Sequence, residues 1–180
     1  MRKFNSYGPI NKRYHYYVDR TTLIESCTEQ LIGIPEEGGH YFTIWGPRQT
    51  GKTWMIRQSI ENIKTAYTDD FIVIEMSMQS FEYSDNDNIH TTFFETWQSL
   101  FSRKLKCDIG KINQWQDWPK QFLRDKDLFN KPLILIIDEF DKLPSEIIDR
   151  LVSMFRDMYL YRDDYVLHGL ALVGVRSVLG

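Results

Sequence analysis

One short segment of the chain combines two glycines, a lysine and a threonine at fixed spacing. It reads Gly46-Pro47-Arg48-Gln49-Thr50-Gly51-Lys52-Thr53, which is the pattern G-x-x-x-x-G-K-[ST]. The glycines let the backbone curl without an obstructing Cβ, so that successive N–H groups point at one centre. Such a ring of amides at the start of a helix binds phosphate oxygens. All eight residues are therefore candidates for binding a nucleotide, with Lys52 reaching the β- and γ-phosphates and the Thr53 hydroxyl ligating Mg²⁺.

A second candidate group is acidic and follows the apolar run 133–137. Asp138 and Glu139 come directly after this run, and Asp141 follows them. In a parallel sheet, ligands bind at the carboxyl ends of the strands. We expect Asp138 to hold Mg²⁺ directly or through water, and Glu139 to act as the general base on an attacking water. The alternative is an acidic turn that caps the next helix, and for Asp141 a capping and a catalytic role both remain open.

Arg176 is the third candidate, because it ends the apolar run 170–175. If this run is a strand between the strand of Gly46 and that of Asp138, the guanidinium would approach the γ-phosphate. A cation there would stabilise the charge that shifts during hydrolysis. A surface arginine in a strand-ending turn is the alternative.

The patterning around these residues alternates between strand-like and helix-like stretches, which favours an α/β fold with a mostly parallel sheet. Strands are predicted at 40–45, 71–78, 132–137 and 167–175. We expect one helix to be capped by Asp19 and to bury Leu23, Cys27 and Leu31. Further helices are predicted after Lys52, over 89–105 and from Pro144 onward, and 107–130 is expected to form another helix plus a polar loop. Residues 1–15 are expected to form an N-terminal arm and 16–180 the core domain.

Composition narrows the class of protein. A chain of 180 residues suits one domain, and its net charge of -3 gives no specific signal for nucleic acid. No apolar run is long enough to cross a membrane, and the N-terminus lacks the apolar centre of a signal peptide. Cys27 and Cys107 have no metal-ligand spacing, so that reduced thiols and a cytoplasmic location are expected.

Three stretches in this order, GPRQTGKT, LILIIDEFD and LALVGVRSV, resemble the AAA-like branch of the P-loop ATPases, especially the STAND and archaeal-ATPase-like groups. The resemblance implies a P-loop NTPase three-layer sandwich that uses ATP and Mg²⁺. It also implies Glu139 and Lys52 as catalytic residues, Arg176 as the sensor residue, and the segment 17–20 near the adenine. Such proteins continue into a fifth strand and a helical lid. Since this sequence ends at Gly180, the resemblance implies a C-terminally truncated domain with the loop strand at a sheet edge.

Three functions follow from these observations. An ATP-hydrolysing switch module is expected first, with a homo-oligomer or a missing C-terminal effector region as its partner. A nucleotide-binding or partner-binding fragment without turnover is the alternative. A small-molecule kinase on the same fold is less well supported, because adjacent Asp and Glu residues are typical of the hydrolytic class that the sequence resembles.

Overall fold

The computed structural model describes residues 3, 13–16, 18–34, 37–67, 69–84, 88–125 and 128–175. Four strands form one sheet, in the order β1-β4-β3-β2, and every pair in it is parallel. Their bounds are β1 Tyr41–Trp45, β2 Ile72–Ser77, β3 Leu133–Asp138 and β4 Leu167–Gly174. All four predicted strands are confirmed, and β4 lies between β1 and β3, as the predicted role of Arg176 requires.

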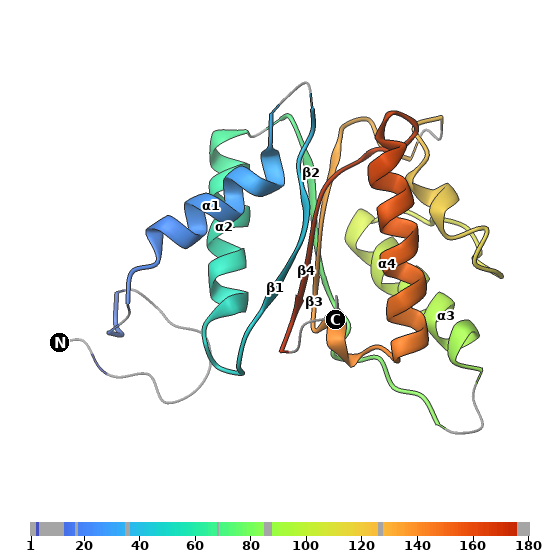
Figure 1. Cartoon of the computed structure of the whole chain (residues 1–180), viewed down its shortest axis with the longest axis horizontal. Helices are drawn as coiled ribbons and strands as arrows, with labels where there is room; N and C mark the ends of the chain where they lie inside the picture. The colour runs from blue at the N-terminus through green and yellow to red at the C-terminus, as the bar shows by residue number, and fades with distance from the viewer. Residues whose placement is uncertain are drawn as a thin grey trace.

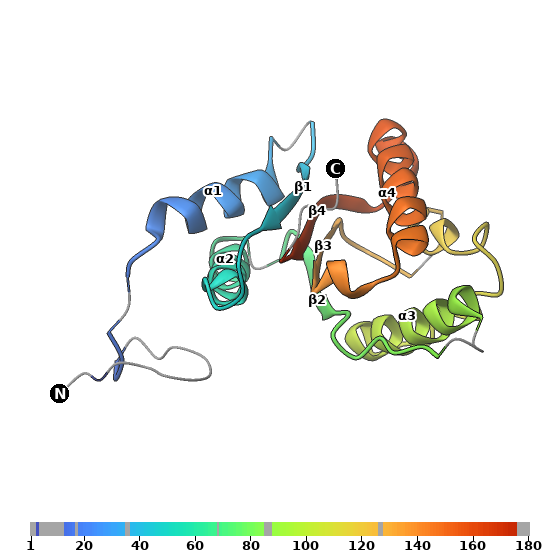
Figure 2. The same ribbon diagram turned by 60° about the horizontal axis from the view of Figure 1, so that its bottom comes forward.

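Helices cover both faces of the sheet, which confirms the three-layer arrangement (Figures 1 and 2). Helices α1 (Thr21–Ile32) and α2 (Lys52–Ala66) lie on one face. Helices α3 (Ile89–Leu105) and α4 (Ser145–Leu160) lie on the other. Three short 3₁₀ turns complete the described elements, namely η1 Pro119–Phe122, η2 Phe140–Lys142 and η3 Arg162–Asp164.

Strand β3 is buried from both sides, as an apolar run covered by two helix layers should be. Leu133, Leu135 and Ile137 belong to the core beneath α3 and α4, whereas Ile134 and Ile136 belong to the core beneath α1 and α2. Within the part of the chain that the structure describes, no helix combines the length and apolarity needed to cross a membrane.

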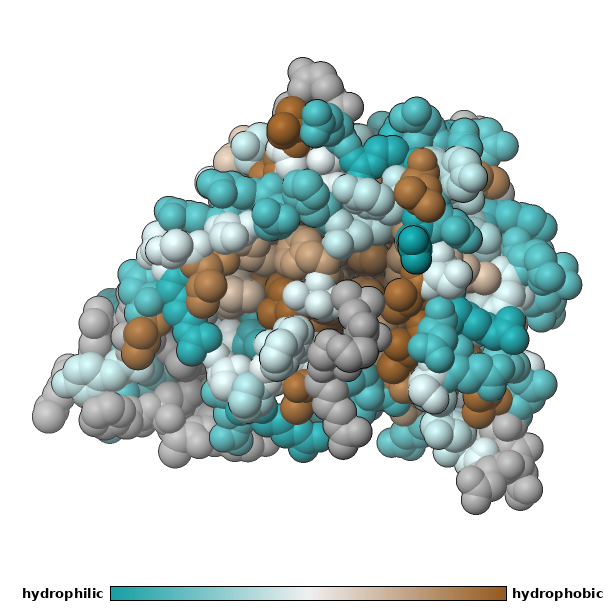
Figure 3. Space-filling model, in the orientation of Figure 1, coloured by the Kyte–Doolittle hydropathy of each residue, from teal (hydrophilic) through white to brown (hydrophobic). Residues whose placement is uncertain are grey.

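Strand β1 forms one edge of the sheet, as expected, because its only strand partner among the described residues is β4. In Figure 1 this edge lies between helices α1 and α2 on one side and helix α4 on the other. Figure 3, drawn in the same orientation, shows apolar side chains in the middle of this face. Trp45, the last residue of the strand, is 63% exposed. The phosphate-loop candidate therefore leaves the sheet at its open edge.

The predicted start of α1 is wrong in two details. Arg20, not Asp19, is the N-cap residue, and no side chain caps the helix; the Asp19 carboxylate accepts a hydrogen bond from the Thr21 hydroxyl at 2.7 Å. Leu23 is 54% exposed, and Ile24 takes its place in the core beside Cys27 and Leu31. Both leucine and isoleucine continue the helical spacing, so only the rotation of the helix against the sheet decides between them.

The helix expected within 107–130 is also wrong, because η1 is the only helical turn in the described part of this stretch. Its side chains nevertheless enter the core, and Trp118 and Phe122 are fully buried. The buried Gln121 accepts a hydrogen bond from Trp97 Nε1 at 3.2 Å and donates one to the Trp118 carbonyl at 3.2 Å. Side-chain bonds and aromatic packing thus replace the helical ladder that the sequence pattern suggested.

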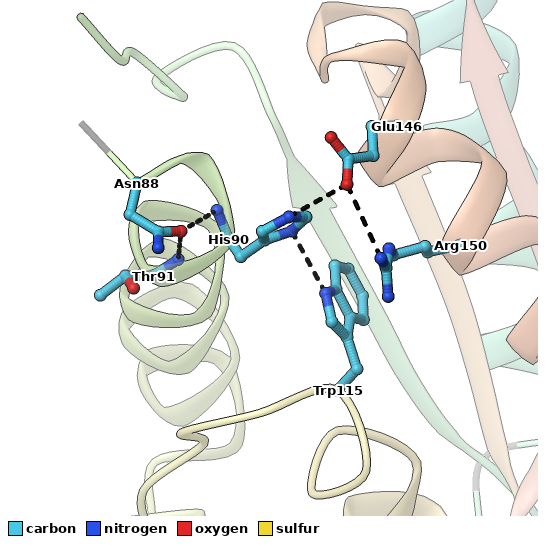
Figure 4. A network of polar contacts seen from close by, with 6 residues as sticks. All are labelled: Asn88, His90, Thr91, Trp115, Glu146 and Arg150. Atoms are coloured by element: carbon cyan, nitrogen blue, oxygen red, sulfur yellow. Dashed lines mark hydrogen bonds and ion pairs between the residues drawn. The ribbon is translucent and has the colours of Figure 1, made fainter. Parts of the chain in front are cut away.

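A polar network joins the first turns of α3 and α4 (Figure 4). Trp115 Nε1 lies 3.2 Å from His90 Nδ1, and His90 Nε2 lies 3.1 Å from a Glu146 carboxylate oxygen. Because an indole N–H can only donate, Nδ1 accepts and Nε2 carries the proton that it donates to Glu146. Arg150 completes the group, 3.7 Å from Glu146 and 5.5 Å from the centre of the Trp115 ring. The network fixes the start of α4, which follows the acidic candidates closely along the chain.

His168 joins the start of β4 to the end of α1. Its Nε2–H donates to the Ile32 carbonyl at 2.7 Å, and its ring packs against Phe71 with centroids 4.8 Å apart. Burial lowers the pKa of His168 below its ordinary value, and the charges of Arg162 and Arg124 act in the same direction. The unfolded chain therefore binds a proton more readily than the folded one.

We predict that the free energy of unfolding is highest above the unfolded histidine pKa of about 6.5 and decreases as the pH falls toward the lower folded pKa. Denaturant unfolding between pH 7.5 and 5 would measure this, with His168→Gln expected to flatten the dependence. His40→Gln, at an exposed histidine, provides the control for the loss of an imidazole. Equal slopes for native protein and His168→Gln would contradict the prediction.

Candidate functional site

The loop between β1 and α2 has the conformation that its glycine and polar residues suggest. Gly51 adopts a left-handed backbone with φ 82°, and Gln49 does so with φ 62° although it carries a side chain. Lys52 then begins α2. Left-handed residues in a turn next to helical ones aim successive N–H groups at one point, which is an anion-binding geometry. A left-handed residue that is not glycine costs about 1–2 kcal/mol, so Gln49 marks a constrained turn.

Within this loop the Lys52 side chain crosses the turn that precedes it. Its ammonium donates to the carbonyls of Gly46 at 2.6 Å and Pro47 at 2.8 Å. The Thr50 hydroxyl also donates to the Pro47 carbonyl, at 2.9 Å. These bonds keep the positive charge of Lys52 over the loop, and a bound phosphate could replace neutral carbonyls as its partner.

Asp138 brings the two candidate groups together across the sheet edge. Its Oδ2 accepts a hydrogen bond from the Thr53 hydroxyl at 2.8 Å, and its Oδ1 accepts one from the backbone N–H of Glu139 at 2.9 Å. Glu139 itself is left-handed, with φ 55°. One carboxylate therefore ties the start of α2 to the end of β3 and stabilises the sharp turn that Glu139 makes.

Arg20 supports the loop from outside. Its guanidinium donates to the Thr50 carbonyl, and one of its nitrogens would lie 3.7 Å from a Cβ at Gly51. Arg20 belongs to the segment 17–20, which the family resemblance alone assigned to the surroundings of the adenine. Tyr17 of that segment lies outside the described residues. No spacing in the sequence links Arg20 to Thr50, which is 30 residues away.

Asp141 lies at the same edge but does not cap a helix, so that alternative is wrong. The N-cap residues of the 3₁₀ turn η2 and of helix α4 are Glu139 and Pro144, and no side chain caps either element. The Asp141 carboxylate lies instead against Gly174, the last residue of β4. Arg176 lies outside the described residues, so its predicted approach to the γ-phosphate stays a prediction.

The donor set at this edge fits a hydrated Mg²⁺ ion. Thr53 and Asp138 supply a hydroxyl and a carboxylate whose oxygens are already within hydrogen-bonding distance, and Mg²⁺ prefers few protein oxygens together with phosphate and water. No group of three or more His, Cys, Asp or Glu side chains with metal-binding geometry occurs among the described residues. A metal at this site would therefore depend on phosphate and water for its remaining ligands.

Known proteins resemble this chain over most of its length. A family of proteins described as the AAA domain matches residues 36–179. The solved structure of Drosophila ORC bound to DNA is 14% identical over 97% of this chain and 47% of that one, with a TM-score of 0.55. The structure of a DNA replication initiation factor is 14% identical over 86% of this chain and 36% of that one, with a TM-score of 0.42. This chain thus spans less than half the length of either, and no curated protein matches it.

The left-handed Gly51 generates a prediction with a matched control. Gly51→Ala should lower the free energy of unfolding by about 1–2 kcal/mol, because an alanine is strained at positive φ. It should also distort the loop and weaken binding of any phosphate ligand. Gly110 is equally left-handed, at φ 78°, and a Cβ added there would meet no atom within 4 Å.

Gly110→Ala should therefore show a similar loss of stability without any change in ligand affinity. Chemical denaturation and titration with a nucleotide measure the two effects separately. If both variants bound a nucleotide as the native chain does, the loop conformation would not matter for binding.

Proposed function

Because the chain belongs to the AAA domain family, we propose that it binds MgATP at the loop 46–53 and hydrolyses it with Glu139 as the general base. The observation that supports this most directly is the Thr53–Asp138 hydrogen bond of 2.8 Å. It joins the phosphate-loop helix to the acidic strand end, and so brings the proposed phosphate and metal ligands to one edge of the sheet.

Binding would depend on the loop amides and on Lys52. The amides from Gly46 to Thr53 would donate to the phosphates, and the Lys52 ammonium would exchange the Gly46 and Pro47 carbonyls for phosphate oxygens. Thr53 and Asp138 would hold Mg²⁺, which supplies positive charge to the β- and γ-phosphates when bound. We propose ATP as the nucleotide because of the family membership, since the sequence contains no motif that reads the base.

Hydrolysis would then need one proton acceptor. The oxygen of a water bonds to the γ-phosphorus, the bond to the bridging oxygen breaks, and ADP leaves with the electron pair. The Glu139 carboxylate would take the proton that the water loses. We propose Arg176 as the sensor cation for this step.

The free thiols of Cys27 and Cys107 are consistent with a proposed cytoplasmic location.

The first prediction of this proposal separates binding from turnover. Lys52→Ala should weaken MgATP binding about 10–100-fold, because it removes a charge-assisted hydrogen bond to phosphate. Glu139→Gln should bind MgATP as the native chain does but release phosphate about 10²–10⁴-fold more slowly. Calorimetry and a phosphate-release assay measure the two effects, and Lys64→Ala at the other end of α2 is the control for loss of a lysine.

The remaining functions are distinguishable outcomes of the same experiment. Phosphate transfer to an added acceptor, but not to water, would favour a small-molecule kinase. Tight MgATP binding without any phosphate release from the native chain would favour a nucleotide-binding fragment. Absence of MgATP binding would refute the proposal as a whole.

A second prediction concerns the metal. Thr53→Val keeps the shape of the side chain but removes the hydroxyl, so its ATP affinity should no longer differ between excess Mg²⁺ and EDTA. Thr53→Ser keeps the hydroxyl and should retain most of the native response to Mg²⁺. Asp138→Asn should resemble Thr53→Val, because the amide removes the negative charge that attracts the ion. An unchanged response to Mg²⁺ in Thr53→Val would exclude this residue as a ligand.

A further inference from the structure

Asp141 carries a carboxylate oxygen that the fold buries and leaves without a partner. Its Oδ1 atom is buried and has no hydrogen-bond partner. The left-handed Glu139 turns η2 back across the end of β4, where Gly174 has no side chain. A Cβ at Gly174 would stand 2.7 Å from Asp141 Oδ1 and 3.0 Å from Asp141 Cγ. The carboxylate therefore packs directly on the strand end, in space that only a glycine leaves open.

This arrangement does not stabilise the fold by itself. A buried acceptor without a donor loses its hydrogen bonds to water and gains nothing in exchange. Asp138 makes the contrast clear, because each of its two oxygens accepts a hydrogen bond. An orphaned carboxylate oxygen so close in the chain to the fully bonded Asp138 suggests that its donor arrives with a ligand.

The register of the sheet places Asp141 at the strand end next to the one from which the phosphate loop starts. Gly174 pairs with Trp45, the residue before the phosphate loop, and β4 lies between β1 and β3. Leu170 and Leu172 of β4 face the core beneath α3 and α4, so the Cα of Gly174 has its open side there too. Asp141 thus approaches the strand ends from one face of the sheet, whereas Thr53 on α2 approaches from the other.

We propose that Asp141 is a positioning residue that accepts a hydrogen bond from the attacking water. This inference rests on the proposed hydrolysis of MgATP. A water has two hydrogens, and two carboxylates two residues apart in one turn can each receive one. Glu139 takes the proton that the water loses when its oxygen bonds to the γ-phosphorus, and Asp141 holds the second hydrogen without removing it. The water is then oriented before the reaction begins, which is where such positioning accelerates a step.

The test uses stability without nucleotide and turnover with it, because the two should change in opposite directions. Asp141→Ala should raise the unfolding midpoint of the nucleotide-free chain by about 2–4 °C, since an unpartnered buried acceptor is removed. The same variant should lower kcat for phosphate release about tenfold or more, with less than about a twofold change in KM. Asp141→Asn keeps an acceptor oxygen and should retain most of kcat. The exposed Asp149 gives the control, since Asp149→Ala should change neither quantity.

Gly174→Ala tests the placement independently. The added methyl group would displace the Asp141 carboxylate, so this variant should lower kcat although both acids remain. In the Asp141→Ala background the same methyl group should cause little further loss, because the carboxylate that it would strike is gone.

Two results would overturn the role of Asp141 alone. One is native MgATP turnover in Asp141→Ala. The other is a joint loss of stability and activity that Asp141→Asn does not restore, which would make the residue structural. Native protein that binds MgATP without releasing phosphate would also end this inference, while leaving nucleotide binding intact. Native protein that binds no MgATP would refute the proposed function itself.

Discussion

The hydrogen bonds of one carboxylate organise the edge of the sheet at which the candidate residues that the structure describes lie. Asp138 accepts from the Thr53 hydroxyl with one oxygen and from the Glu139 N–H with the other. The first bond fixes α2, and so the loop before it, against the strand end. The second supports a backbone turn that a glutamate adopts only at a cost of about 1–2 kcal/mol. Helix, strand and turn therefore depend on the same side chain, and a change at Asp138 alters all three.

That carboxylate can act in this way only because of the strand order. The chain passes from β1 to β2 at the far edge and returns through β3 to β4, which fills the space between β3 and β1. All strands are parallel, so their carboxyl ends share one edge although residues 53 and 138 are far apart in sequence. The apolar residues of β3 hold this order in place, because they are buried beneath helices on both faces. The core packing that holds the strand order therefore also sets the positions of Thr53 and Asp138.

The sequence predicted most of the fold because its signals are local and repeated. Strand β3 is an unbroken apolar run and α4 keeps its helical spacing, so both could be recognised without knowing their neighbours. The proximity of Thr53 and Asp138 also follows from a general rule, since both lie at the carboxyl edge of a parallel sheet. The expected burial of Leu23 is wrong because the helical period allows either of two adjacent residues, here Leu23 or Ile24, to face inward. The helix expected around Trp118 is wrong because the hydrogen bonds of a buried glutamine and aromatic packing hold this stretch in place, and neither has a periodic signature.

The contacts that sequence could not predict are those between segments with no shared period. Arg20 reaches Thr50 across 30 residues, and Asp141 meets Gly174 only because Glu139 bends the chain. The opposite end of the molecule differs in kind. There Arg162 donates to the Gly39 carbonyl at 3.1 Å and lies over Tyr159, while His168 donates to the Ile32 carbonyl. Left-handed Gln49 and Glu139, and the orphaned oxygen of Asp141, all lie instead at the carboxyl edge. Two of the three left-handed residues other than glycine in the described part of the chain therefore lie where a phosphate ligand could stabilise them, together with one of its two orphaned buried atoms. The third such residue, Lys106, ends α3, and the other orphaned atom, Trp118 Nε1, lies in the core beneath α3 and α4, so that backbone strain alone does not mark a site and the geometry of Thr53 and Asp138 is needed beside it.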